Sequence, residues 1–397
     1  MPAPPARPNY ERSKPAPQIY TKLREKNMSK VRLIVKMWAA SAAILGQSIV
    51  AAHADDDYVK MAKEFISRAT APTTGWAGPT AGPKAQRHKV VIYVSADQRN
   101  GGARGVDEGA EEAAKVIGWD FRTLDGQGSV SERTSVLNQA IALKPNGIIL
   151  GSVDAAEQAP LIEQAAKQGI SVVGWHSGPG PGTIEGSPIF TNVTTDPTEV
   201  GKTAGLYAVA DSNGTAGVVL FTDSIYQVAT NKTDAAASAV RGCKTCKVLS
   251  IEDTPINDAS NRMPQLTTSL LSRFGKKWTY SIGVNDLYFD FMAPSLRSAD
   301  IPGNGFPRSI SAGDGSVPAF ERIRETEYQV GTVAEPLHLH GWQCIDELNR
   351  AFAGQPPSGF VAAVHLFVPS NISSDGGANE MYDPAGYKEA YTKIWGK

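Results

Sequence analysis

The sequence lacks the short motifs that mark the commonest enzyme families. It contains no G-x-S-x-G nucleophile turn and no G-x-x-x-x-G-K-[ST] phosphate-binding loop. The turn over residues 97–105, after the first predicted strand, also lacks the G-x-G-x-x-G pattern of dinucleotide sites. A carboxylate pair for glycoside hydrolysis could be chosen from Asp97, Asp314 and Glu335, but nothing in their spacing favours hydrolysis over binding. These absences favour a binding protein over an enzyme.

Cysteine is scarce, with three residues in a chain of 397, and there are six histidines. Cys243 and Cys246 form a C-x-x-C pair, which could be a redox centre, half of a zinc site or a small disulfide. Redox pairs of this spacing open a helix, whereas this pair lies between a predicted helix and a strand, and no second pair of ligands has zinc spacing. We therefore favour the disulfide. Cys344, on an apolar helix face, is interpreted as a buried small side chain.

Long hydrophobic runs are also absent. A basic stretch over residues 30–36 precedes an apolar stretch over 37–50 and the small-x-small sequence Ala52-His53-Ala54, which is typical of a cleaved secretory signal. An apolar segment of about 14 residues is too short to anchor the chain by spanning a bilayer. We predict export to the periplasm with cleavage near Ala54. Because residues 1–27 precede an intact signal, we also predict that translation begins at Met28.

Neither sign of charge is in large excess, since the formal net charge is -1. Residues 1–54 hold nine Lys or Arg and two Asp or Glu, so the remaining residues hold 30 against 38, a net charge of -8. An acidic body argues against a nucleic-acid partner. With 397 residues and 41% hydrophobic content, the chain is long enough for more than one domain, and we predict two.

What is present is a repeated alternation of strand and helix patterns. Residues 89–95 form an almost unbroken β-branched run, which is typical of a central parallel strand covered on both faces. A polar turn and a helix pattern over residues 103–117 follow, and strand and helix patterns continue to alternate up to residue 192. A second series with the same alternation begins at residue 196. The further predicted strands are 119–124, 147–150, 170–175, 189–192, 216–221, 246–251, 280–284, 309–312, 329–334 and 361–368. We predict an α/β fold with two Rossmann-like, doubly wound parallel sheets.

Polar side chains follow the carboxyl ends of these strands, where open α/β sheets bind ligands. About half are expected to be helix caps, with Asp154, Asp196 and Asp286 the best examples. Trp175 could pack in the core or stack on a ligand. His176 has no companion His or Cys at metal spacing, so a zinc site is not expected. We predict no metal and no cofactor. The candidate ligand-binding residues are Asp97, Gln98, Arg99, Asn100, Trp175, His176, Tyr226, Asn285, Asp314 and Glu335.

Six short sequences, taken in order, carry a resemblance to a known family. They are Val94-Ser95, Leu124-Asp125-Gly126-Gln127, Gly147-Ile148-Ile149-Leu150, Gly169-Ile170-Ser171-Val172-Val173, Asn285-Asp286 and Gly313-Asp314-Gly315. In this order the chain resembles the exported type-1 solute-binding proteins of the ribose/galactose class, which deliver small polar solutes to ABC importers. The resemblance covers about residues 89–369.

The resemblance implies two Rossmann-like lobes joined by a three-strand hinge that closes around a ligand. The crossovers are expected near residues 192–195, 335–336 and 365–367. The expected segments are the N-terminal extension and signal (1–54), a helix and linker (55–88), a first lobe (89–192 plus 336–365) and a second lobe (193–335 plus 366–397).

The resemblance also assigns ligand-binding roles by position. Two further candidates, Asn231 and Asp258, join those named above. The assigned roles are Gln98 as an amide of the first loop, Asn285 and Asp314 as an amide and a carboxylate of the second lobe, Glu335 as a polar hinge residue, and Asn231 where ribose-binding members carry arginine.

Two departures from the family bear on the ligand. The first loop offers Arg99-Asn100-Gly101-Gly102 where the family usually has aromatic rings, and Trp175-His176 replaces an Asp-Arg pair. We therefore expect a neutral or amine-bearing polyol or sugar, with ribose and strongly anionic ligands bound weakly or not at all.

The predicted function is a periplasmic receptor for a small polar solute, acting as a monomer and delivering the solute to an ABC importer permease. The alternative is a secreted sensor that presents its bound form to a membrane signalling receptor. A DNA-binding repressor with the same core is set aside, because the signal occupies the place of a helix-turn-helix.

Overall fold

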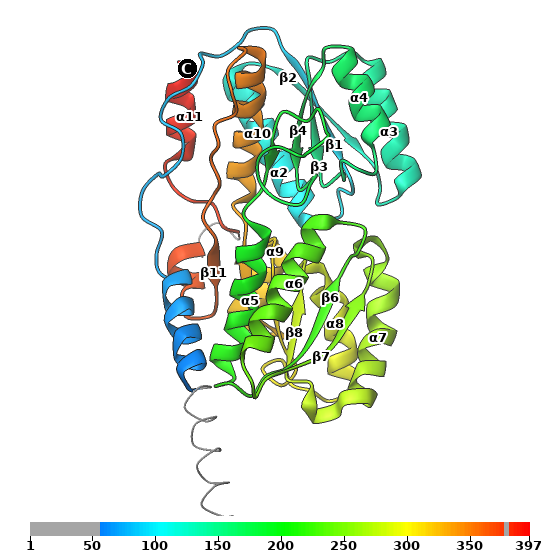
Figure 1. The fold of residues 1–397 in the computed structure, drawn as a ribbon, viewed down its shortest axis with the longest axis vertical. Coiled ribbons are helices and arrows are strands. Elements are labelled where there is room, and N and C mark those ends of the chain that lie inside the picture. The colour runs from blue at the N-terminus through cyan, green and yellow to red at the C-terminus, as the bar shows by residue number, and fades with distance from the viewer. Residues whose placement is uncertain (1–55, 377–380) are drawn as a thin grey trace, which may run out of the picture. The chain divides into compact units, whose positions relative to one another are not determined.

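The computed structural model describes residues 56–376 and 381–397 (Figure 1). The predicted secretory signal, its cleavage near Ala54 and the predicted start at Met28 lie outside these residues. Within the described ranges, no helix combines the length and the apolar character needed to cross a lipid bilayer.

The first lobe is built on a parallel sheet with the strand order β2-β1-β3-β4-β5. In β1, Val91 and Tyr93 face one apolar cluster while Ile92 and Val94 face another. Side chains alternate between the two faces of a strand, so both faces of β1 are covered, as its unbroken apolar run predicts. The elements are β1 (Val90–Ser95), α2 (Gly101–Ile117), β2 (Asp120–Asp125), α3 (Val130–Ala142), β3 (Gly147–Gly151), α4 (Ala159–Lys167), β4 (Ser171–Trp175) and β5 (Asn192–Val193).

The second lobe is built on a six-stranded sheet with the order β11-β10-β9-β8-β6-β7, in which only β11 is antiparallel to its neighbour. The elements are α5 (Pro197–Asp211), β6 (Gly217–Thr222), α6 (Gln227–Gly242), β7 (Lys247–Asp253), α7 (Ala259–Phe274), β8 (Tyr280–Gly283), α8 (Leu287–Ser298), β9 (Arg308–Ser311), α9 (Val317–Glu325), β10 (Gln329–Ala334) and β11 (His365–Phe367). The predicted fold class, two helix-covered sheets in two lobes, is confirmed.

The chain passes between the two sheets three times at the expected places. It leaves the first sheet after β5 and enters α5. It returns after β10 through α10 (Leu337–Phe352), whose Leu337, Trp342 and Leu348 lie in the apolar core of the first lobe. It then reaches β11, which pairs with β10 in the second sheet. The residues expected as crossovers therefore lie where the chain changes lobe.

The C-terminal helix α11 (Tyr387–Trp395) lies in the first lobe. Tyr387, Tyr391 and Trp395 are buried with Trp342 of α10, and the Trp395 ring stacks on Trp342 at 5.4 Å between centroids. The expected assignment of residues 366–397 to the second lobe is therefore wrong for α11. The aromatic content indicated that the C-terminal tail packs on the protein. It packs on the first lobe because the apolar face of α10 lies there.

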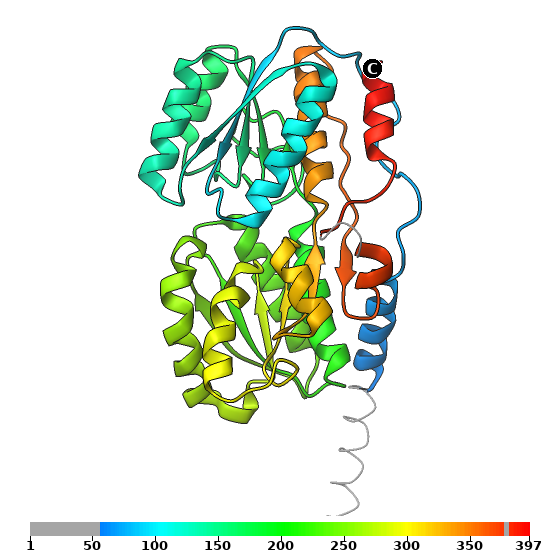
Figure 2. The ribbon, with the colours of Figure 1, turned by 180° about the vertical axis from the view of Figure 1, so that it is seen from behind.

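The N-terminal segment also contacts both lobes. A helix over residues 56–69 packs on the second lobe, where Ala62 is fully buried and the Tyr58 hydroxyl donates to the Ala239 carbonyl at 2.7 Å. The following segment reaches the first lobe, where the Trp76 ring contacts the Tyr391 ring at 5.6 Å. Figures 1 and 2 show this helix (blue) and α11 (red) on the side of the molecule where β11 lies.

All three cysteines are buried in the protein. Cys243 and Cys246 are joined by a disulfide at the connection between α6 and β7. Both are buried in the core of the second lobe, and Cys344 is buried in α10. The disulfide is the alternative that the sequence favours.

We expect Trp395→Ala to destabilise the first lobe. Its ring is 1% exposed, and its indole N–H donates to Asp346 at 2.8 Å. Truncation of a buried tryptophan should lower the free energy of unfolding by about 3 kcal/mol or more, which urea denaturation measures. Leu143→Ala, at a side chain 49% exposed, is the control and should change the value by about 0.5 kcal/mol or less. Equal losses in the two variants would show that α11 does not stabilise this core.

Candidate functional site

A pocket lies between the lobes at the carboxyl ends of the strands of both sheets. Its empty volume is about 620 Å³, including open space at its mouth. Loops after β1, β3 and β4 line it from the first lobe, and α6 with the loops after β7, β8 and β9 line it from the second. Six of the candidate residues line this pocket: Asp97, Asn100, His176, Tyr226, Asn285 and Asp314.

Three candidates point elsewhere. Gln98 donates its side-chain amide to Asp107 of α2 at 3.1 Å. Arg99 is mostly exposed and binds both carboxylate oxygens of Asp97, at 2.9 and 2.8 Å. Asp258 is a half-buried residue at the start of α7, paired with Arg262 of the same helix. The structure therefore does not bring these three side chains to the pocket, although Arg99 neutralises the carboxylate of Asp97.

Two asparagines of the second lobe hydrogen-bond across the cleft to backbone carbonyls of the first. The Asn231 amide donates to Pro179 at 2.8 Å, and the Asn257 amide donates to Gly128. Asn257 lines the pocket and was not among the sequence candidates, whereas Asn231 was predicted to contact ligand. These bonds close the lobes over the pocket.

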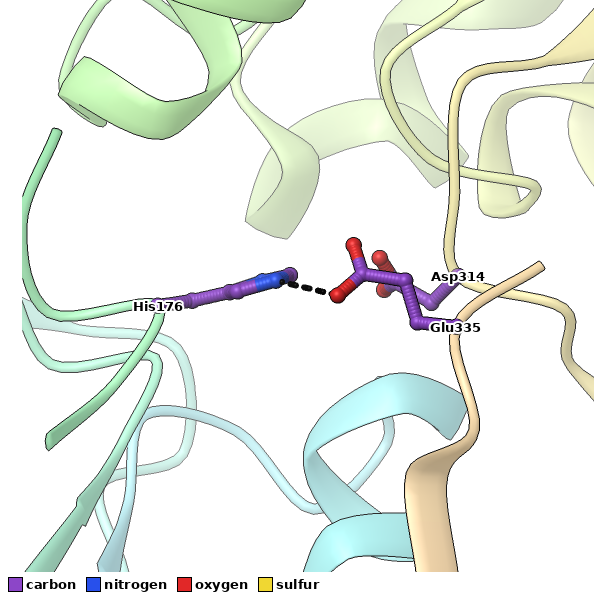
Figure 3. Close-up of side chains that lie close together, drawn as sticks. All are labelled: His176, Asp314 and Glu335. Carbon is purple, nitrogen blue, oxygen red and sulfur yellow. Dashed lines mark hydrogen bonds and ion pairs between the residues drawn. The ribbon is translucent and has the colours of Figure 1, made fainter. Parts of the chain in front are cut away.

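A cluster of buried charged residues lies beside the pocket, and three of its members, His176, Lys232 and Asp314, line it. Glu335, which follows β10 and is fully buried, lies 3.0 Å from His176 Nε2 of the first lobe (Figure 3). The Lys232 ammonium, from α6 of the second lobe, donates to the other Glu335 oxygen at 2.9 Å and lies 3.7 Å from Asp314. The Asn285 amide donates to Asp314 at 2.8 Å. We call His176, Lys232, Asp314 and Glu335 the hinge cluster.

Burial and neighbouring charges act in opposite directions in the hinge cluster. Burial would raise the pKa of Glu335, but His176 and Lys232 outweigh it and hold that pKa well below its usual value. Burial would lower the pKa of Lys232, but Glu335 and Asp314 raise it instead. Burial raises the pKa of Asp314 to about 6, against the opposing effect of Lys232. Lys232 and Glu335 are therefore charged at neutral pH, while Asp314 titrates close to it.

Trp175 is fully buried and supports His176 instead of facing the pocket. The two rings stack with centroids 4.0 Å apart and planes 12° apart. The Trp175 indole N–H donates to His340 Nδ1 at 3.1 Å, and burial lowers the pKa of His340 to about 4, so this nitrogen is an acceptor at neutral pH. Of the two roles considered for Trp175, the structure places it in core packing, where it orients His176.

The hinge cluster also has the donor types of a metal site. His176, Asp314 and Glu335 each offer one ligand atom, and these atoms lie within 4.8 Å of one another. However, the Lys232 ammonium already hydrogen-bonds to Glu335 and lies beside Asp314. A divalent cation would place two further positive charges beside this buried ammonium. The residues fit an ion-pair network better than a metal centre.

Lys232 is the main residue that sequence reasoning missed. The resemblance pointed to Asn231, but adjacent helical residues point about 100° apart. Asn231 consequently meets Pro179 while Lys232 reaches the hinge cluster. A signal was present, because Lys232 falls four residues from both Val228 and Ala236 on the buried face of α6. A lysine on that buried face of the helix indicates that an acidic side chain is buried beside it.

Comparison with known proteins identifies a family and a set of similar folds. Residues 90–356 match the family described as "Periplasmic binding protein domain". A comparison with curated proteins found no significant match.

Three solved structures illustrate the similarity of fold. A glucose-galactose binding protein from Geobacillus stearothermophilus has 20% identity and a TM-score of 0.62, covering 72% of this chain and 99% of its own. The binding protein of an arabinose ABC transporter from Shewanella sp. ANA-3 has 14% identity and a TM-score of 0.62, covering 77% and 95%. A solute binding protein from Agrobacterium vitis with bound allitol has 16% identity and a TM-score of 0.59, covering 72% and 97%.

The family match extends over more than half of the chain and contains both strand series. It confirms the resemblance that the ordered sequence motifs indicated. The chain belongs to the periplasmic binding protein domain family.

Proposed function

We propose that the protein is an exported receptor that captures a sugar or polyol between its lobes and delivers it to the permease of an ABC importer. The observation that carries the proposal is a pocket between two lobes that are bridged by hydrogen bonds, lined by hydrogen-bonding side chains from both lobes. Family membership and the ligands named for the similar structures, which include arabinofuranose and allitol, support it.

We further propose that the protein performs no chemistry of its own and acts as a periplasmic monomer. The structures it resembles are named as binding or transport proteins. In the hinge cluster, the acidic and basic groups bind one another, an arrangement that suits holding a ligand. The signal-like sequence before residue 55 and the acidic body support export and argue against a nucleic-acid partner.

The charges around the pocket support a neutral or amine-bearing ligand. Arg99 balances Asp97, and Lys232 balances Glu335. Asp314 therefore adds negative charge at neutral pH. A strongly anionic ligand would meet this charge in a desolvated site, which is unfavourable. Hydroxyl or ammonium donors of a ligand would instead stabilise it.

A thermal-shift screen tests the proposed function. A sugar or polyol at about 100 times its Kd should raise the melting temperature of the purified protein by about 5 °C, because it binds only the folded state. The panel contains aldoses, ketoses and alditols, with sugar phosphates and ribose for comparison. If no neutral or amine-bearing polyhydroxy compound raises the melting temperature, or if only a sugar phosphate does, the proposal is wrong.

Binding should weaken in acid because of Asp314. Its carboxylate is ionised above a pKa of about 6 and accepts ligand hydroxyls in that form, so affinity is lost as the pH falls through this value. Calorimetry should show up to about tenfold weaker binding at about pH 5 than at about pH 7.5. Asp314→Asn should bind more weakly at the higher pH and lose this part of the pH dependence. Asp258→Asn, at a half-buried carboxylate outside the pocket lining, should behave as wild type. An equal affinity at both pH values would contradict the role of Asp314.

The cross-lobe amides should slow ligand release. Asn257→Ala removes a hydrogen bond to Gly128 that forms only when the lobes meet. One such bond is worth about 1 kcal/mol, so stopped-flow dissociation of the best ligand from the screen should be about fivefold faster. Asn231→Ala should act in the same way through Pro179. Asn138→Ala, which removes an amide bond within α3, should leave the rate unchanged. Unchanged dissociation in the first two variants would refute their role in closure.

A further inference from the structure

The second lobe lines the pocket with four aliphatic side chains, here called the wall, as well as with polar groups. The wall is formed by Val228 and Ala229 of α6, Ile256 of η1 (Ile256–Asp258) and Val284, which follows β8. Ala229 and Val284 belong to one buried apolar cluster, against which Ile256 and Tyr226 pack. Three of the four wall residues therefore belong to or pack on one apolar cluster, whereas Val228 lies outside it.

A ligand hydroxyl against this wall would lose its water without gaining a partner. The four wall residues carry only C–H groups on their side chains, so they neither donate nor accept hydrogen bonds. Burying an unpartnered hydroxyl is unfavourable, whereas burying a methyl or methylene group there is favourable. The wall consequently distinguishes a deoxygenated carbon from a hydroxylated one.

Two residues of the hinge cluster that line the pocket, Lys232 and Asp314, are polar and can bind hydroxyl groups. Lys232 uses one of its three N–H donors on Glu335, and Asp314 accepts from Asn285 at one oxygen while its other oxygen faces Lys232 at 3.7 Å. A donor and an acceptor therefore lie side by side on the pocket lining. Two neighbouring hydroxyls of a ligand match this pair, since one accepts from Lys232 and the other donates to Asp314.

The pocket also lacks a pair of opposed aromatic rings. Tyr226 carries the only phenyl, phenol or indole ring among the described residues that line it. Two rings on opposite faces would be needed to sandwich the C–H faces of a fully hydroxylated pyranose. The aliphatic lining comes instead from the wall on the second lobe and from Ala96 and Ala103 of the first.

We propose that the pocket selects deoxy sugars or deoxy polyols, with two neighbouring hydroxyls on Lys232 and Asp314 and the deoxygenated carbon on the wall of Val228, Ala229, Ile256 and Val284. This inference rests on the proposed function, since it specifies which polyhydroxy ligands the same pocket takes. It makes the second lobe the source of discrimination between a C–OH and a C–H group.

Matched pairs of sugars that differ in one hydroxyl test the inference. The probes are L-fucose against L-galactose, L-rhamnose against L-mannose, and D-fucose against D-galactose, each titrated calorimetrically into the purified protein. In at least one pair, the 6-deoxy member should bind about tenfold more tightly than its hydroxylated partner. Equal or tighter binding of the hydroxylated member in every pair that binds would overturn the inference.

Two other outcomes separate this inference from the proposed function. If none of the six sugars binds while allitol, L-arabinose or another fully hydroxylated compound does, the receptor function stands and the deoxy preference is wrong. If no polyhydroxy compound binds at all, the proposed function fails and the inference fails with it.

A substitution in the wall provides the second measurement. Val228→Thr keeps the shape of the side chain and adds a hydroxyl that can pair with a ligand hydroxyl. It should reduce the preference for the deoxy member by about fivefold, with the melting temperature of the ligand-free protein as the check on folding. Val361→Thr, at a side chain 41% exposed and away from the pocket lining, is the matched control and should leave the preference unchanged. A preference that Val228→Thr leaves unchanged would show that the wall does not set it.

Discussion

Glu335 imposes the constraint on which the closed site depends. A fully buried carboxylate is stable as a charge only when opposite charges and hydrogen-bond donors surround it. Glu335 follows β10 at a crossover, and its partners come from different lobes, His176 from the first and Lys232 from the second. The carboxylate is therefore fully compensated only when both lobes approach the crossover. The electrostatic stability of buried Glu335 is therefore coupled to the closure of the two lobes around the pocket.

Closure also depends on weaker contacts near the mouth of the cleft. The amides of Asn231 and Asn257 add single hydrogen bonds between the lobes, each worth about 1 kcal/mol. Lys232 and Asp314 of the second lobe retain bonding capacity toward the pocket, and a ligand that binds them while also contacting first-lobe residues such as Asn100 stabilises the closed arrangement selectively. Because the contacts between the lobes are individually modest, ligand binding can decide between closed and open arrangements. A receptor that must also release its ligand requires such a balance.

The sequence was sufficient for the architecture because local patterns encode it. The β-branched run of β1 requires cover on both faces, and polar residues follow strands such as β8 and β9 where parallel strands end together. These patterns located Asp97, His176 and Asp314 in one pocket. They did not distinguish Asn231 from Lys232, since that choice depends on the rotation of α6 relative to a carboxylate about one hundred residues away.

The remaining differences arise where a side chain can satisfy the same requirement in more than one place. An indole at a strand end can bury itself on a ligand or in the core, and for Trp175 the outcome depends on the position of His340, which only the folded α10 provides. The aromatic face of α11 likewise needs an apolar partner. The sequence patterns of the two lobes do not show which lobe provides it. Both ambiguities are resolved by α10, which belongs in sequence to the later crossovers and in space to the first lobe. This helix supports Trp175, Trp175 supports His176, and His176 contacts Glu335, so the core packing of the first lobe positions a polar partner of the buried carboxylate.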